Sequence, residues 1–391
     1  MVGRWLFGVT LTVLLLWRCM LPVGAVSDGW EDPIPAMGAG VESEYRQYVE
    51  SIPDEIAKYL PREWFAKEGR PDFSKIAESV ADMSSFSYLL GVIGDVLSVE
   101  WGTAWRILAQ TVGLLLISAV ANILCRTFRS EALSHMVSLG VSCTVFVSLV
   151  GTLYGQLQKV SVFLVRLNHL VNSLLPLMTA LHVMGGNVAV AAVQHSSLML
   201  FLSVCENVCN RTVIPMTGIC LALTVASVFS PGWSLKGMTG LIKSSYTRTL
   251  GFIMMLLSFV LSTQTVLRAA SDSLTARTAK FLAGHLIPVV GGALGDTLRT
   301  VASGVAFLKS TVGIGAMIVL FLLLIPVLVS LLLTRLSFRL SLTVAEMLGC
   351  QNESKLLQEL VGIYGTLVAV VSLCSVLLVI ALTLFVRVSA A

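Results

Sequence analysis

The sequence predicts an all-α, polytopic integral membrane protein with about eight transmembrane helices and one broken, re-entrant amphipathic segment. Of its 391 residues, 56% are hydrophobic and only 12% are charged, and the mean hydropathy of +0.87 is that of a membrane protein. Apolar runs of about twenty residues, the length that crosses a bilayer, recur in its second and later thirds. These three observations exclude a soluble fold for the whole chain.

Residues 1–25 have the features of a secretory signal peptide. Arg4 precedes an apolar core from Leu11 to Leu16, and Val23-Gly24-Ala25 forms a small-residue cleavage site. We therefore expect the mature chain to begin outside the membrane. Arg18, inside the cleavage region, leaves an uncleaved membrane anchor as the alternative.

Residues 26–84 are predicted to form an acidic extracytoplasmic helical segment ahead of the membrane domain, residues 85–391. From Val26 to Glu100 there are 15 acidic and 6 basic residues (net −9), whereas from Trp101 onward there are 7 acidic and 18 basic (net +11). About sixty residues cannot bury a large core alone, so this segment is expected to dock on a neighbour or on the membrane domain. A solvated tether is the alternative. Helical spacing places four apolar side chains on one face, those of Val41, Tyr45, Tyr48 and Val49.

The membrane domain is predicted to open with an interfacial stretch, Phe86–Gly102, anchored by Trp101 and Trp105 as aromatic-belt residues. Eight later segments are long and apolar enough to span a bilayer, and they place the C-terminus outside if the N-terminus is outside. The predicted spans lie near Trp105–Leu124, Val137–Leu157, Val160–Leu181, Val188–Cys205, Thr212–Phe229, Leu250–Val266, Thr311–Leu333 and Val361–Phe385.

The stretch Ser271–Thr300 is too polar to cross lipid unaided, although its apolar residues recur at helical spacing. Three charged residues mark its wetter end, and a proline with two glycines interrupts any helix near its middle. A broken segment at membrane depth must border protein or water, because unpaired backbone amides in hydrocarbon cost several kcal/mol each. We expect this stretch to line or gate a path. The residues are Asp272, Arg277, Lys280, Pro288, Gly291 and Gly292.

A second break, Pro176 with Gly185-Gly186, lies earlier in the chain and matches the first in kind. Broken helices expose half-helix ends whose partial charges bind ions or substrates. Pro176 and Pro288 are 112 residues apart, and three apolar-Gly pairs recur at a spacing of 111 residues. This spacing is compatible with a parallel internal repeat of Leu139–Thr249 and Leu250–Leu360; chance matching in a Leu-, Val- and Gly-rich chain is the alternative.

Polar side chains cluster within two turns of one predicted span, where Arg166, Asn168, His169 and Asn172 occur together. Ionisable groups inside a membrane indicate function by default, so Arg166 and His169 are candidates for lining a water-filled path. The alternative is hydrogen bonding between helices, with Arg166 reaching to an interface.

No catalytic motif is present: there is no HExxH, P-loop or GxSxG sequence, and no apolar span carries a pair of acidic residues. The eight cysteines are scattered and suggest no disulfide framework. Cys205 and Cys209 share a helix face, but no further ligand is spaced to complete a metal site. We predict no enzymatic activity, no metal, no cofactor and no nucleic-acid partner.

The sequence TARTAKFLAGHLIPVVGGALGD resembles the signature region of the stage III sporulation protein AE family, and a weaker likeness extends over most of the chain. His285 departs from the pattern, which has Asn or a small residue there. The resemblance implies a multi-pass protein of the mother-cell membrane around the forespore. It also implies an assembly with the other stage III A-operon proteins and the forespore stage II sporulation protein Q.

The function that this resemblance implies is a membrane-embedded channel or permease component of the complex linking mother cell and forespore, required for forespore development. Two alternatives stay open from the sequence alone. One is a stand-alone secondary transporter of a small solute, which would keep ionisable residues in a closed site. The other is a membrane scaffold that transports nothing and tolerates the loss of its polar groups.

Overall fold

A computed structural model describes residues 39–65, 73–127, 131–184, 199, 211–229, 237–259, 263 and 291–387. Within these residues the fold is all-α and contains no β-strand. Four of the described helices are long and apolar enough to cross a membrane. The predicted all-α fold is therefore confirmed and four helices able to span a membrane are present, whereas the count of eight spans, the re-entrant segment and the internal repeat are not confirmed.

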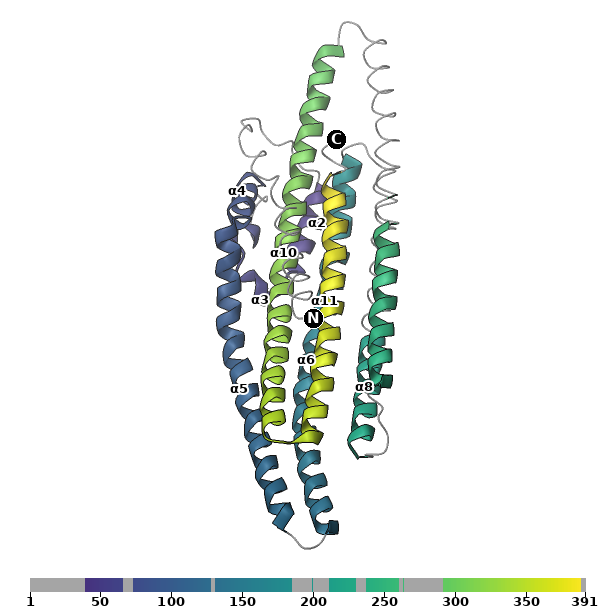
Figure 1. Cartoon of the computed structure of the whole chain (residues 1–391). Helices are drawn as coiled ribbons and strands as arrows, with labels where there is room; N and C mark the ends of the chain where they lie inside the picture. The colour runs from purple at the N-terminus through teal and green to yellow at the C-terminus, as the bar shows by residue number, and fades with distance from the viewer. Residues whose placement is uncertain are drawn as a thin grey trace.

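The centre of the bundle is an antiparallel pair of helices, α10 (Gly291–Met347) and α11 (Gln351–Arg387), which Figure 1 shows side by side. The turn between them has the hydrogen bonding of a Schellman cap, since the Cys350 amide donates to the Ala345 carbonyl at 3.0 Å. Gly349 takes a φ of 72°, which a side chain would disfavour.

The apolar runs of α10 and α11 are buried by protein to a much greater extent than those of their neighbours. The buried share of the most apolar window is 72% in α10 and 76% in α11, against 28% in both α5 (Phe86–Thr127) and α6 (Glu131–Met184). A helix that is apolar all round is buried in protein or in lipid. Here, α10 and α11 are the inner pair and α5 and α6 the outer pair.

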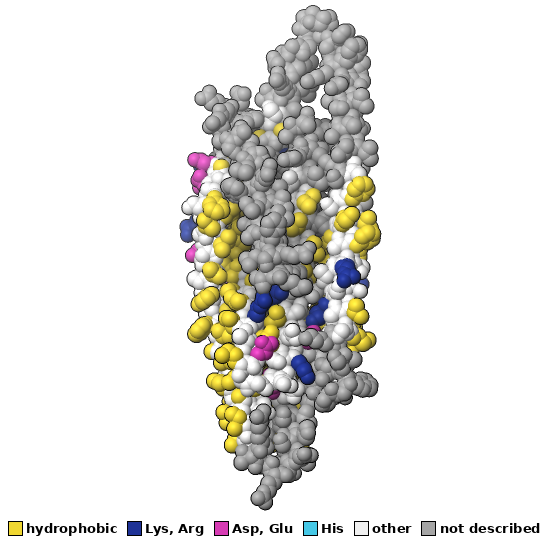
Figure 2. All heavy atoms as spheres, viewed as in Figure 1, with side chains coloured by type: hydrophobic (Ala, Val, Ile, Leu, Met, Phe, Trp, Pro, Cys, Tyr) yellow, Lys and Arg dark blue, Asp and Glu magenta, His cyan; other side chains and the backbone are white. Residues whose placement is uncertain are grey.

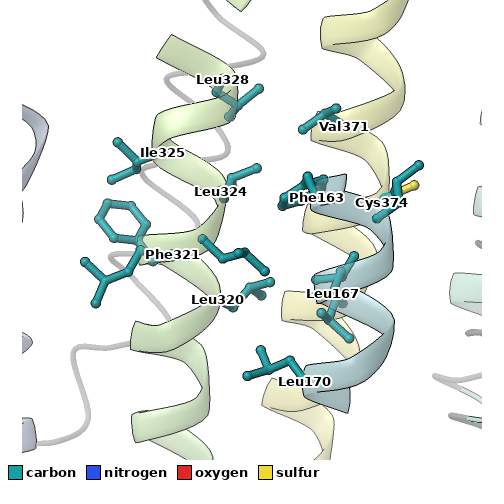
Figure 3. Close-up of a cluster of buried hydrophobic side chains, with 14 of the residues drawn as sticks. Phe163, Leu167, Leu170, Leu320, Phe321, Leu324, Ile325, Leu328, Val371 and Cys374 are labelled. Carbon is teal, nitrogen blue, oxygen red and sulfur yellow. The ribbon is translucent and has the colours of Figure 1, made fainter. Parts of the chain in front are cut away.

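Side chains from three helices fill the centre of the bundle. Phe163 and Leu167 of α6 point toward Leu320 and Leu324 of α10, and Val371 of α11 closes the cluster (Figure 3). Every residue of α10 from 311 to 325 is buried. The axis of the described bundle is thus a packed hydrophobic core.

Helix α6 corrects one prediction. The predicted spans Val137–Leu157 and Val160–Leu181 are parts of a single helix of 54 residues, which at 1.5 Å per residue is about 80 Å long. No helix breaker separates the two runs, because Gln158 and Lys159 are good helix formers. A bilayer core is about 30 Å thick, so only part of α6 can lie in lipid.

Helix α5 likewise joins two predicted elements, the interfacial stretch Phe86–Gly102 and the span Trp105–Leu124, into 42 continuous residues. Its exposed face carries large apolar side chains, including Ile117, Val120 and Ile123. Figure 2 shows hydrophobic side chains along the edge formed by α5 and along the opposite edge, formed by α8 (Arg211–Phe229) and residues 237–259.

Helix α8 agrees with the predicted span Thr212–Phe229 to within one residue, and it packs against α11. Residues 237–259 form a helix that overlaps the predicted span Leu250–Val266. The predicted signal peptide and, apart from residue 199, the predicted span Val188–Cys205 lie outside the described residues.

The acidic segment docks on the bundle through four short helices: α2 (Ala39–Glu50), α3 (Asp54–Ala57), η2 (Arg62–Phe65) and α4 (Phe73–Met83). Helix α2 packs on α6, and α4 packs on α10. The predicted apolar face is confirmed, because all four of its side chains are buried. For residues 39–65 and 73–83, docking on the membrane domain is therefore correct and the solvated tether is wrong.

Candidate functional site

A layer of polar side chains connects α5, α6 and α10. Lys159 Nζ of α6 donates to Ser330 Oγ of α10 at 2.8 Å and lies 3.3 Å from Glu100 Oε1 of α5. Gln156 Nε2, one turn earlier on α6, lies 3.1 Å from Thr334 Oγ1 and 3.3 Å from Ser330 Oγ. We call these five residues the polar layer. Its buried members, Gln156, Ser330 and Thr334, are hydrogen-bonded within the layer, as buried polar groups require, and Lys159 and Glu100 lie at its more exposed end.

Arg166 connects α6 to the acidic segment. Its guanidinium donates from Nη1 to Glu55 Oε2 at 2.6 Å and from Nη2 to Glu55 Oε1 at 3.2 Å. This two-pronged hydrogen bond lowers the pKa of the Glu55 carboxyl, and the charge of Arg166 acts in the same direction. The sequence allows two roles for Arg166, lining a water-filled path or hydrogen bonding between helices. In the described residues, Arg166 of α6 bonds to Glu55 of α3.

A groove of about 530 Å³ lies between the polar layer and the Arg166–Glu55 pair. We call it the α6 groove, because α6 forms one wall, with α3, α5 and α10 forming the others. Its floor is apolar, and includes Phe163, Leu322 and Pro326. Its charged residues are Glu55, Lys58, Glu100, Lys159 and Arg166.

A second buried polar cluster lies where α11 begins. Glu353 is 2% exposed, and its Oε1 accepts hydrogen bonds from Ser118 Oγ of α5 at 2.9 Å and Ser142 Oγ of α6 at 2.8 Å. Glu353 forms no ion pair among the described residues. The cluster therefore joins three helices through a carboxylate and two hydroxyl groups.

Two glycines of α11 leave room for cationic side chains from neighbouring helices. A Cβ at Gly362 would lie 2.7 Å from Nζ of Lys243, which pairs with Glu359. A Cβ at Gly365 would lie 3.2 Å from Nη2 of Arg335 in α10. Small residues here permit the close approach that these charged side chains need.

Three of the predicted path residues are described with their side chains, and they form no common site. Helix α6 continues through Pro176 and ends at Met184, so Pro176 does not break it. His169 is exposed, and Arg166 pairs with Glu55.

Of the remaining predicted residues, Gly291 and Gly292 are the first two residues of α10. Because Pro288 lies outside the described residues, the break formed by Pro288 with Gly291-Gly292 and the gate both stay predictions. The other predicted residues lie outside the described residues; they are Asp272, Arg277, Lys280, Pro288, Gly185 and Gly186.

Sequence reasoning misses the polar layer and the Glu353 cluster. Lys159 lies between two predicted spans, where a connection is expected, and Ser330 and Thr334 lie in an apolar run where hydroxyl groups usually bond to their own helix. Gln156 and Lys159, three residues apart on one helix face, are the available signal. Within the described residues, no group of three His, Cys, Asp or Glu side chains could hold a metal ion.

Comparison with known proteins places the chain in a family. The family model of stage III sporulation protein AE matches residues 72–389, which is most of the chain. The chain belongs to the stage III sporulation protein AE family. The matched region contains the whole polar layer and the Glu353 cluster, whereas Glu55 and Lys58 of the α6 groove precede it.

A relative within the family is the stage III sporulation protein AE of Bacillus subtilis (strain 168), which is 22% identical over 209 residues. The match covers 54% of this chain and 52% of the relative, so the chain spans about half the length of the curated relative that it matches. No solved structure matches the chain.

Proposed function

We propose that this chain is a membrane-embedded component of the sporulation complex that links mother cell and forespore, and that it contributes to a channel or permease. Its partners in this proposal are the other stage III A-operon proteins and the forespore stage II sporulation protein Q. Membership of the stage III sporulation protein AE family supports a role in sporulation. Four helices able to cross a membrane support a multi-pass location in the cell membrane.

The observation that favours a component over a self-sufficient transporter is the filled axis of the bundle. Residues 311–325 of α10 are buried without interruption, and the side chains around them include those of α6 and α11 (Figure 3). Interiors packed in this way have few voids larger than a water molecule. A solute path along this axis has no room, so we place the path between this chain and other subunits.

The polar layer distinguishes the channel component from a scaffold. In a scaffold, the layer fixes only the register of α5, α6 and α10, so a variant that still folds and retains its partners still supports spore formation. In a channel component, a change in the layer alters the assembled path. The test variant is Gln156→Leu with Lys159→Met, which removes the polar groups of α6 and keeps good helix formers at both positions.

The experiment is a purification in mild detergent from a sporulating host in which this chain replaces the host's own copy, with mass spectrometry of the co-purifying proteins and a count of spores. We expect the A-operon proteins and protein Q to co-purify with the unchanged chain. We expect the double variant to retain these partners and to lose spores.

Three outcomes contradict the proposal. Purification of the chain without those partners would contradict its membership of the complex. Normal spore counts for the double variant would favour a scaffold. Solute uptake by the chain alone in liposomes would favour the stand-alone transporter.

A further inference from the structure

The α6 groove joins an apolar floor to a charged rim. The floor is formed by aliphatic and aromatic side chains of α5, α6 and α10, including Val96, Phe163 and Leu322. Three cationic and two anionic side chains form the rim, which leaves a net charge of +1. A volume of about 530 Å³ is typical of sites for small ligands. The groove therefore has the amphipathic character of a site for a singly charged anion with an apolar tail.

The two anionic side chains of the rim are already paired. Glu55 bonds to Arg166, and Glu100 bonds to Lys159. Lys58 is the remaining cation, and its Nζ lies 4.7 Å from the centre of the Tyr59 ring. The uncompensated charge of the groove thus lies on the α3 side of the rim, at Lys58.

The position of the groove along α5 places its mouth at the level of lipid headgroups. Glu100 lines the groove, and the next aromatic residues of α5, Trp101 and Trp105, are 55% and 64% exposed. Exposed tryptophans mark the membrane interface. Residues 107–124 then carry no charged side chain and expose Ile117 and Val120. Lipid chains accordingly contact this face next to the tryptophans, and Glu100 places the groove beside the interface that the tryptophans mark.

We propose that the α6 groove binds an anionic phospholipid, with the phosphate at Lys58, Lys159 and Arg166 and the first part of an acyl chain on the apolar floor. The single negative charge of a phosphodiester matches the net charge of the rim. A partner helix is the less favoured occupant, because the groove is short for a helix that must bury several turns. The proposal stands on the groove alone and does not depend on the proposed function.

The test is native mass spectrometry of the purified full chain, released from micelles that contain equal amounts of palmitoyl-oleoyl phosphatidylglycerol and phosphatidylcholine. We expect one phosphatidylglycerol to be retained with a preference of about tenfold or more, because phosphatidylcholine carries the same phosphate but its choline cation cancels the negative charge that the rim attracts. Inorganic phosphate at a large excess should not displace it, because phosphate cannot use the apolar floor.

Two variants test the site by independent routes. Gly155→Leu fills the groove from α6, where an added Cβ meets nothing within 4 Å, and Lys58→Glu reverses the uncompensated charge. Each should reduce the preference for phosphatidylglycerol about tenfold. Gly151→Leu is the control for the first, because Gly151 is also exposed on α6 with nothing within 4 Å of an added Cβ. Arg62→Glu, an equal charge change at an exposed residue of η2, is the control for the second.

Equal retention of both lipids by the unchanged chain would overturn the proposal. The same holds if both groove variants bind as the unchanged chain does, or if the controls lose the preference equally. Displacement by inorganic phosphate would assign the groove to a free anion instead. A co-purified peptide in place of lipid, lost in Gly155→Leu, would assign it to a partner helix.

Discussion

At the residue scale, Gly315 of α10 lies against Trp64 of the acidic segment. An added Cβ would lie 2.7 Å from Cη2 of Trp64, and Trp64 is held in place by the hydrogen bond from its Nε1 to Ser79 Oγ at 2.9 Å. No real Cβ contact is this short, so any side chain at 315 must displace the indole ring.

We therefore predict that two glycine substitutions change the stability of the folded chain in opposite directions. Gly113→Ala in α5 meets nothing within 4 Å and should stabilise by up to about 1 kcal/mol, the helix preference of alanine over glycine. Gly315→Ala gains the same helix preference, but its Cβ displaces Trp64. It should therefore lower the stability of the folded chain and speed trypsin cleavage near Lys58 and Arg62. Thermal unfolding in detergent measures both, and equal stabilisation by the two changes would show that Trp64 does not pack on Gly315.

The Glu353 cluster makes a second prediction at this scale. Ser118→Ala and Ser142→Ala each remove a hydroxyl donor from a buried carboxyl group, and each should cost about 1.5–3 kcal/mol. Ser98→Ala is the control, since Ser98 is exposed and donates only to the Asp95 carbonyl of its own helix. Denaturant titration of the four proteins provides the comparison. Losses no larger than that of the control would leave Glu353 without a structural role.

The Glu55 carboxyl predicts a dependence on pH. Because the hydrogen bond from Arg166 lowers the pKa of Glu55 in the folded chain, the pair stabilises docking at neutral pH, and this stabilisation is lost as the pH falls through that lowered pKa. The Glu55 side chain is 72% exposed, so the effect is small. Protease sensitivity of residues 39–65 should rise on acidification in the unchanged chain and rise less in Glu55→Gln. Identical pH profiles would contradict a contribution from the pair.

At the scale of elements, the features that the sequence predicts correctly are those that depend on local periodicity. The buried face of α2 and the bounds of α8 can be found because each depends on residues a few positions apart. The continuity of α6 is missed, since a twenty-residue criterion divides any longer apolar run at its first polar pair, Gln158-Lys159. Only packing by α2, α5 and α10 explains why such a long helix persists.

The polar layer belongs to a different class of feature. Lys159 bonds to residues 59 and 171 positions away in the sequence, and Glu353 bonds to residues 235 and 211 positions away. A single sequence carries no record of such pairings, so its polar residues can be placed on helices but not matched to partners. The predicted gate around Pro288 and the glycines is inferred from local breaks, and it stays a prediction for that reason.

At the scale of the whole molecule, the inner helices are covered by protein and the outer helices expose their apolar faces. The acidic segment contributes to this cover, because α4 and α3 pack on α10 in the region that the sequence predicts to span lipid. The exposed edges along α5 and along α8 with residues 237–259 remain available for lipid or for other subunits (Figure 2). In the proposed channel component, this division places the path between subunits rather than through this bundle.

The most direct test of that division is the access of water to α10 in the assembled complex. The test uses a chain whose eight native cysteines are replaced. A single cysteine at Leu320 is compared with one at Arg62 during sporulation, with a small water-soluble thiol reagent. Leu320 is fully buried, and Arg62 is exposed on η2 outside the α6 groove. We predict rapid labelling at position 62 and none at position 320. Labelling of position 320 at the rate of position 62 would show a water-filled path through the bundle and contradict the packed core.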